Sequence, residues 1–122
     1  MEADASLLRS LPVKMAAFVE PMECVSVSKL REGSQWLWEI KLDGYRTLAV
    51  KFDSNVTLFS RRKKPLNSKF PCIVDSLADL PDDTVVDGEL VCLDDSWRLD
   101  FNLLQNFLSC ISCVLNEHRR VQ

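Results

Sequence analysis

The spacing of the hydrophobic residues changes at residue 70, and this change constrains the fold more than any other feature of the chain. Residues 36–42 alternate strictly, as expected of a half-buried strand, with one face formed by Trp36, Trp38, Ile40 and Leu42. The alternation resumes after Gly44, and an Asp53-Ser54-Asn55 turn separates that strand from a third one at 56–60. We therefore predict an antiparallel meander over residues 36–60.

From residue 70 the hydrophobic residues recur at helical spacing, which predicts a helix over 70–80. A further strand is expected over 84–93. A last helix is expected over 101–114 with Asp100 as its N-cap, followed by a frayed polar tail at 116–122. The predicted fold class is α+β, an antiparallel sheet with packed helices. A partial sheet would expose an unpaired edge, so we expect self-association through that edge.

The chain has 122 residues, of which 47% are hydrophobic and 27% charged, which is the balance of one globular domain. It contains no apolar run of the roughly 20 residues that a membrane span requires. Its first residues include Glu2 and Asp4 and do not resemble a signal peptide. We therefore expect a cytoplasmic protein with no membrane partner.

The net charge of -3 conceals two segments of opposite sign. Residues 41–69 contain eight basic side chains and two acidic ones, whereas residues 75–100 contain nine acidic side chains and one basic one. A local basic segment can bind phosphate even in a chain that is acidic overall. The average charge therefore does not exclude a phosphorylated ligand.

The five cysteines are an odd number without secretory context, so no disulfide framework is expected. Cys110, Cys113 and His118 resemble half of a zinc site but offer three ligands where structural zinc takes four. Buried apolar cysteines on the predicted helix are the favoured interpretation, with zinc left open.

Lys41 lies between two carboxylates, Glu39 and Asp43, on one face of the first predicted strand, directly before Gly44. Such a lysine is more often part of a cross-strand ion pair than a nucleophile. However, glycine allows close approach of the backbone to a bound group, and Arg46 offers a planar fork suited to phosphate. Both interpretations remain open from the residues alone.

Four segments in order resemble one family. The string Lys41-Leu42-Asp43-Gly44-Tyr45-Arg46 resembles the Lys-x-Asp-Gly-x-Arg signature of covalent nucleotidyltransferases. Residues 18–22 (Phe-Val-Glu-Pro-Met), 58–62 (Leu-Phe-Ser-Arg-Arg) with Phe70-Pro71, and 87–91 (Asp-Gly-Glu-Leu-Val) are similar to segments of bacterial ATP-dependent DNA ligases. The resemblance implies a partial, ATP-grasp-like nucleotidyltransferase domain over 18–115, with an N-terminal extension at 1–17 and a polar tail at 116–122.

The resemblance also implies roles for individual residues. Lys41 would attack the α-phosphate of ATP and form a lysyl-AMP, which is then passed to the 5′-phosphate of nicked double-stranded DNA in repair or recombination. Glu39 would accept a hydrogen bond from adenine, and Arg46 and Arg61 would hold the ribose and phosphates. Glu89 would bind the ribose or help to hold Mg²⁺, for which carboxylate oxygen is a suitable ligand.

Arg62, Lys63 and Lys64 would contact the DNA backbone, although four adjacent cations at 61–64 are most often a solvated loop. The Asp87-Gly88-Glu89 segment taken alone is likewise a common turn. Trp36 and Trp38 are interpreted as core aromatics in preference to base-stacking platforms.

The chain departs from the family at several places. Lys63 stands where the family usually has glycine, no lysine follows Lys69, and the adenine-stacking aromatic and the OB-fold domain are not identifiable. We therefore expect a truncated ligase with weak or no self-adenylylation and no nick sealing by itself. The alternatives are a catalytically incompetent nucleotide- or DNA-binding remnant and, less favoured, a capping-type guanylyltransferase or RNA ligase.

Overall fold

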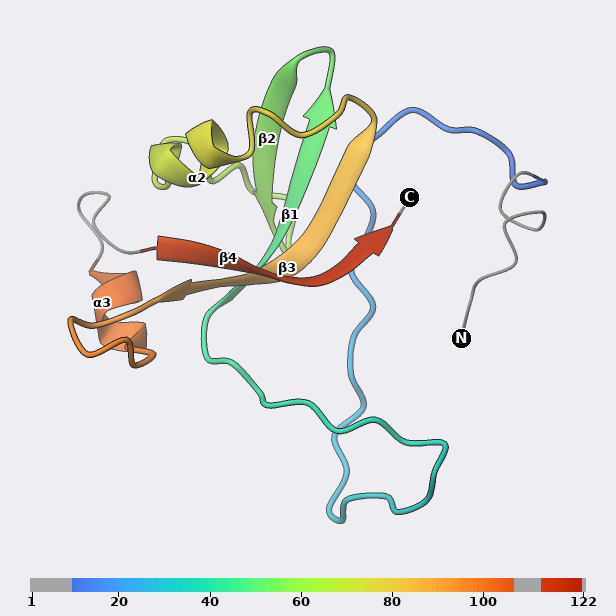
Figure 1. The fold of residues 1–122 in the computed structure, drawn as a ribbon, viewed down its shortest axis with the longest axis vertical. Helices are drawn as coiled ribbons and strands as arrows, with labels where there is room; N and C mark the ends of the chain where they lie inside the picture. Colours follow the sequence, from blue (N-terminus) through green and yellow to red (C-terminus); the bar gives the residue numbers. More distant parts are fainter. Residues whose placement is uncertain (1–9, 107–112, 122) are drawn as a thin grey trace.

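The structure, a computed structural model, describes residues 10–106 and 113–121 of the chain. Four strands form one antiparallel sheet in the order β2-β1-β3-β4, and two short helices accompany it (Figure 1). The strands are β1 (Tyr45–Phe52), β2 (Asn55–Ser60), β3 (Thr84–Cys92) and β4 (Cys113–Val121), and the helices are α2 (Pro71–Ser76) and α3 (Phe101–Gln105). The predicted α+β class is confirmed.

The β1–β2 hairpin forms at the predicted turn. Asp53 and Ser54 have φ angles of 48° and 62°, the left-handed conformation of a two-residue hairpin loop, which aspartate adopts more readily than serine. The Asp82 side chain accepts a hydrogen bond from the Ser54 N–H at 3.0 Å. Lys51, although charged, is buried, and its Nζ donates to the carbonyl oxygens of Ser54 and Ala78, both at 3.0 Å. The hairpin is therefore fastened to the turns that follow α2.

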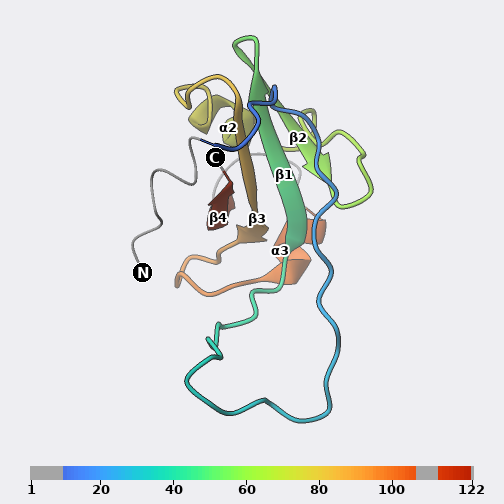
Figure 2. The ribbon, with the colours of Figure 1, turned by 90° about the vertical axis from the view of Figure 1, so that its right-hand side faces the viewer.

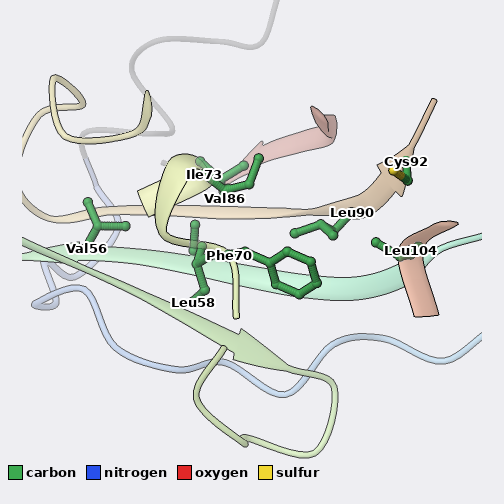
Figure 3. Packing of buried hydrophobic residues seen from close by; sticks show 9 residues of the cluster. Val56, Leu58, Phe70, Ile73, Val86, Leu90, Cys92 and Leu104 are labelled. Atoms are coloured by element: carbon green, nitrogen blue, oxygen red, sulfur yellow. The ribbon is translucent and has the colours of Figure 1, made fainter. Parts of the chain in front are cut away.

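The hydrophobic core lies between one face of the sheet and the two helices (Figure 3). Phe70, directly before α2, is fully buried, as is Leu104 of α3. The buried cluster comprises Ala49, Val56, Leu58, Phe70, Ile73, Val86, Leu90, Cys92 and Leu104. Burial of large side chains from both helices, at roughly 1.5–3 kcal/mol each, holds these short helices on the sheet.

The N-terminal segment runs along the other side of β1 (Figure 2). The Phe18 ring meets the Phe59 ring edge-on at 5.5 Å between centroids, and the Ala16 N–H donates to Asp83 at 3.1 Å. Leu48 and Val50 of β1, which alternate with the core residue Ala49, are also buried. Both faces of β1 are therefore covered.

The expected first strand at 36–42 does not form. These residues have no ladder partner in the described part of the chain, and they belong to a long excursion away from the sheet (Figure 1). Trp38 and Ile40 are 59% and 84% exposed, so the interpretation of Trp36 and Trp38 as core aromatics is wrong for this structure. Alternation is sufficient for a strand only when a neighbouring strand accepts its backbone hydrogen bonds.

Both predicted helices are shorter than expected. The first ends at Ser76 and continues as turns through Asp79, because Pro81 and a run of turn residues follow. The second begins after the Asp100 N-cap as predicted, with Asp100 accepting hydrogen bonds from the backbone N–H groups of Asn102 and Leu103, but it ends at Gln105. Residues 113–121, expected as the end of the helix and a frayed tail, instead form β4. The edge of β3 offers them a hydrogen-bonding ladder, with one register shift between Asp87 and Gly88, and this pairing outweighs the local helical pattern.

Pairing with β4 means that β3 is not an edge, and the outer edge of β2 is partly satisfied. The Asn67 side chain accepts from the Leu58 N–H at 2.7 Å and donates to the Val56 carbonyl oxygen at 2.8 Å. Large exposed hydrophobic side chains gather instead on the excursion between residues 22 and 40. Self-association stays a prediction. The exposed residues of the excursion form a more apolar surface for it than the outer edge of β2 does.

The cysteines do not behave as one group. Cys92 is a buried free thiol, Cys24 is an exposed free thiol, and Cys72 is disulfide-bonded, which the odd cysteine count did not predict. Cys110 lies outside the described residues. Cys113, expected on a helix, and His118, expected in a frayed tail, both lie on β4. Among the described residues, no three metal-ligating side chains come together.

Candidate functional site

An open pocket of about 650 Å³ lies where β1 begins and β2 ends, beside the middle of β3. Its size falls in the ordinary range for a small-molecule site. The lining residues come from these strands and from the connection between β2 and α2: Gly44, Tyr45, Arg46, Ser60, Arg61, Arg62, Lys64, Leu66, Lys69 and Glu89. Five of the ten are basic and one is acidic, so the pocket favours an anion.

Most of the residues selected from the sequence are brought together in this pocket. Arg46, Arg61 and Glu89, expected to hold a nucleotide, all line it, as do Arg62 and Lys64 from the expected DNA-binding group. Lys63, Glu39 and Lys41 are exposed and are not part of the lining. Lys41 lies three positions before Gly44, in the irregular stretch that leads into β1.

Arg46 is held in place by Asp87 of β3. Its Nε and Nη2 groups donate to the two carboxylate oxygens of Asp87, both at 2.5 Å. The β1–β3 register explains the geometry, because Arg46 stands opposite Glu89 and Asp87 is two residues further along the same face. The hydrogen bond with Asp87, opposed by desolvation and reinforced by the negative charges of Asp87 and Glu89, raises the pKa of Arg46 above its ordinary value. The planar guanidinium of Arg46, fixed by two hydrogen bonds, therefore lies at the pocket wall.

Gly44 is required by the packing of the strands. A Cβ built at Gly44 would lie 2.3 Å from the carbonyl oxygen of Leu90 and 3.0 Å from Val91 Cγ1. The sequence suggested that this glycine allows the backbone to approach a bound group. In the structure the close neighbour is the β3 backbone, which lets β1 start directly against the Glu89–Leu90 stretch.

The basic loop after β2 is a tight turn closed by backbone hydrogen bonds. The Ser60 N–H donates to the Lys64 carbonyl oxygen and the Lys63 N–H donates to the Ser60 carbonyl oxygen, both at 2.8 Å. Lys63 has a φ of 59°, the left-handed conformation that glycine adopts more readily. The lysine thus keeps the conformation suited to glycine, and its ammonium lies 5.6 Å from the centre of the Phe18 ring, away from the pocket lining.

Five lining residues were not among the site residues selected from the sequence: Gly44, Tyr45, Ser60, Leu66 and Lys69. Tyr45 was quoted only as a variable position of the lysine motif, and Lys69 only as part of the basic segment. The Lys69 ammonium lies 5.1 Å from the centre of the Tyr45 ring. The alternation of β1 could have shown that Tyr45 lies on the face of the sheet opposite to that of Arg46. The position of Lys69 could not be predicted in this way, because it depends on the turn before α2, which has no periodic pattern.

A divalent ion would find one carboxylate in this lining, that of Glu89. Glu89 is half-buried and its oxygen is of the kind that Mg²⁺ prefers. Mg²⁺ commonly binds to one or two carboxylates and takes its other ligands from water and substrate phosphates. The residues therefore fit a metal that arrives with a phosphorylated ligand, rather than a site built wholly by the protein.

A basic pocket at the end of an antiparallel sheet, with one carboxylate and a fixed arginine, is a candidate binding site for a phosphorylated ligand. The chain belongs to the ATP dependent DNA ligase domain family, whose family model matches residues 17–109. This confirms the resemblance to part of a bacterial ATP-dependent ligase adenylation domain.

The relatives include bacterial ligases. The chain is 34% identical over 93 residues to the SPbeta prophage-derived DNA ligase-like protein LigB of Bacillus subtilis, covering 75% of this chain and 34% of that protein. It is 36% identical over 93 residues to the multifunctional non-homologous end joining protein LigD of Pseudomonas aeruginosa, covering 75% of this chain and 11% of that protein. The chain thus spans about a third or less of the length of these two relatives.

A solved structure of mycobacterial DNA ligase D complexed with ATP and MES matches with a TM-score of 0.61 and 29% identity, covering 69% of this chain and 28% of that one. The ligase domain of LigD from M. tuberculosis matches with a TM-score of 0.59 at the same identity and coverage. Within the described residues, no helix has the length and hydrophobicity that a membrane span requires.

Proposed function

We propose that this chain supplies the nucleotide-binding part of an ATP-dependent DNA ligase, with Lys41 as the residue that accepts AMP. One observation carries the proposal: Arg46, Arg61 and Glu89, selected from three separate motifs, line a single basic pocket. The ATP bound to mycobacterial DNA ligase D, a structural neighbour, supports ATP as the ligand.

The chemistry begins with the Lys41 amine in its neutral form. The Nζ lone pair attacks the α-phosphorus of ATP, a P–N bond forms, pyrophosphate leaves with the electrons of the broken P–O bond, and Nζ gives up its proton. An oxygen of the 5′-phosphate at a DNA nick then attacks the phosphorus of the lysyl-AMP, the P–N bond breaks and Nζ takes up a proton from solvent. The 3′-hydroxyl next attacks the 5′-phosphate, loses its proton to solvent and displaces AMP as the phosphodiester forms. Each step moves a phosphoryl centre, so positioning and positive charge supply most of the catalysis.

The pocket residues would provide that charge. Arg61 and the Asp87-held Arg46 bind the phosphates, and Glu89 binds the ribose or one Mg²⁺, which when bound would offset phosphate charge. Arg62, Lys63 and Lys64 contact the DNA backbone at the pocket mouth. This assignment agrees with the lining for all but Lys63, which lies beside Phe18.

Lys41 and Glu39 reach the nucleotide by movement of the stretch that precedes β1. Both are exposed and only a few residues before Gly44, which lines the pocket. Because residues 36–43 have no ladder partner in the described chain, no backbone hydrogen bonds of a sheet need to break when they move. Glu39 then accepts from the adenine amino group.

A second candidate function is binding of nucleotide or DNA without adenylylation. The position of Lys41 and Glu39 outside the lining favours it. A guanylyltransferase function has less support, because the named relatives are DNA ligases and ligase-like proteins.

Incubation of the whole chain with α-labelled ATP or GTP and Mg²⁺ separates these functions. We expect weak covalent label from ATP alone, lost in Lys41→Ala and retained in Lys29→Ala, since Lys29 is an exposed residue outside the pocket. Label from GTP would indicate the guanylyltransferase. Binding of ATP without any covalent label would support the second candidate and contradict the first.

A further inference from the structure

Lys69 is a cation of the pocket to which no role has yet been given. It lies in the turn before α2, and its side chain lines the pocket together with Arg62 and Lys64. All three belong to the connection between β2 and α2 and all three are exposed. Their accessibility makes them available to a ligand larger than the pocket.

Two aromatic rings position the Lys69 ammonium. Nζ lies 5.1 Å from the centre of the Tyr45 ring and 5.4 Å from that of Phe70. Phe70 is fully buried, and Tyr45 packs edge-on against Phe101 at 5.6 Å between centroids. A cation over fixed rings is held by their quadrupoles but is not neutralised, because the rings carry no net charge.

Two of the three arginines of the same pocket have a carboxylate neighbour. Arg46 is paired with Asp87, and Arg61 Nη1 lies 3.9 Å from Glu23 Oε1. Within residues 10–106, no ion pair joins the Lys69 ammonium to a carboxylate. The charge of Lys69 is therefore placed but uncompensated, which is the state expected of a residue that awaits a phosphate.

We propose that Lys69 binds a backbone phosphate of the DNA substrate, alongside Arg62 and Lys64. A nucleotide presents its phosphates at one point, whereas a DNA strand presents them in a row, so several exposed cations on one surface segment suit the strand better. Arg46 and Arg61 remain for the ATP phosphates. This inference rests on the proposed ligase function and adds one contact to it.

The test measures the affinity of the whole chain for a nicked duplex with a 5′-phosphate at several salt concentrations. The slope of the logarithm of the binding constant against the logarithm of the salt concentration is negative, and the loss of one phosphate contact reduces its magnitude by about 0.9. We expect Lys69→Gln to lose about that much slope and to bind several-fold more weakly at low salt. Lys69→Arg should keep the wild-type slope, and the exposed Lys29→Gln is the matched control without effect.

Affinity for ATP alone, measured on the same variants, identifies the source of the phosphate. We expect it to be unchanged in Lys69→Gln. A loss of ATP affinity with an unchanged DNA slope would overturn the inference in favour of a nucleotide phosphate. The inference would also be overturned if Lys69→Gln had the same slope as Lys29→Gln. In that case the proposed function would still stand, provided that the wild-type chain binds nicked DNA. If the wild-type chain binds no nicked DNA at any salt concentration, the proposed function and this inference both fail.

Discussion

Arg46 on β1 and Asp87 on β3, 41 positions apart in the sequence, form a doubly hydrogen-bonded ion pair at the wall of the basic pocket. The arginine and aspartate side chains are 33% and 23% exposed, so the pair is partly shielded from water. The pair belongs to the two most informative motifs of the chain. Asp87, which had no assigned role, fixes Arg46 and would act on the proposed ligand through it.

Replacing Asp87 with asparagine should weaken ATP binding without removing any group that touches ATP. The amide can accept only one of the two hydrogen bonds, and the Arg46 fork then turns away from the pocket. We expect about a tenfold loss of affinity, equivalent to about 1.4 kcal/mol, in calorimetric titration. Asp95→Asn, at an exposed loop position, is the control.

The same titration on a double variant tests whether Asp87 acts through Arg46. Combining Asp87→Asn with Arg46→Ala should cost no more affinity than Arg46→Ala alone, because the two residues work as one unit. Fully additive losses would contradict the positioning role.

Gly44→Ala should destabilise the fold, because the new methyl group would meet the Leu90 carbonyl oxygen, which is part of the β3 backbone and cannot rotate away. We expect a loss of about 1–3 kcal/mol in the free energy of unfolding, the usual cost of overpacking. Urea denaturation measures it, with Ser28→Ala as an exposed control. An unchanged midpoint would show that β1 and β3 are not so closely apposed.

A series at Lys63 tests the left-handed turn of the basic loop. Residues that tolerate a φ of 59° should be accepted and β-branched ones should not. We therefore expect Lys63→Val to be less stable than Lys63→Gly by about 1–2 kcal/mol in urea denaturation, with Lys63→Asn between them. Equal stability of the valine and glycine variants would be inconsistent with this backbone conformation.

Lys51 belongs to the basic segment of the sequence but supports the fold and not the ligand. Lys51→Met keeps the buried hydrocarbon stem and leaves the Ser54 and Ala78 carbonyl oxygens without this donor. We expect a loss of about 1–3 kcal/mol in the free energy of unfolding with ATP affinity unchanged. Lys29→Met, with an exposed side chain, should change neither quantity. Reduced ATP affinity in a folded Lys51→Met variant would argue against this division.

Self-association should depend on the exposed tryptophans of the excursion. Trp36 and Trp38 are 43% and 59% exposed, whereas Asn67 hydrogen-bonds to the outer edge of β2. Replacing both tryptophans with serine should shift the protein toward monomer in sedimentation measurements. Disruption by a charged residue at Thr57 of β2, with no effect of the tryptophan changes, would point to the sheet edge instead.

Periodicity was sufficient to predict three of the four strands. In β1, β2 and β3 the alternating positions meet a packed core, and the Asp53-Ser54 turn fixes the hairpin between the first two. The failures at 36–42 and 113–121 have one cause in common. A strand depends on where a partner strand lies, and the local pattern does not contain that information.

The pocket was only partly predictable, because some of its features depend on which strands and turns lie side by side. Motif residues identified Arg46, Arg61 and Glu89, because their chemistry is written in the sequence. The Arg46–Asp87 pair depends on the β1–β3 register, and the place of Lys69 depends on the turn before α2. Neither relationship is carried by a spacing along the chain.

The central claim is that ATP binds in the pocket between the start of β1 and the end of β2. Titration of ATP into the isotopically labelled chain, followed residue by residue through backbone amide NMR signals, tests it most directly. We expect shifts concentrated at Gly44, Tyr45, Arg46, residues 60–64 and Glu89. The claim would be contradicted by shifts centred on the shallow basic depression at residues 26–31, or by no shifts at saturating ATP.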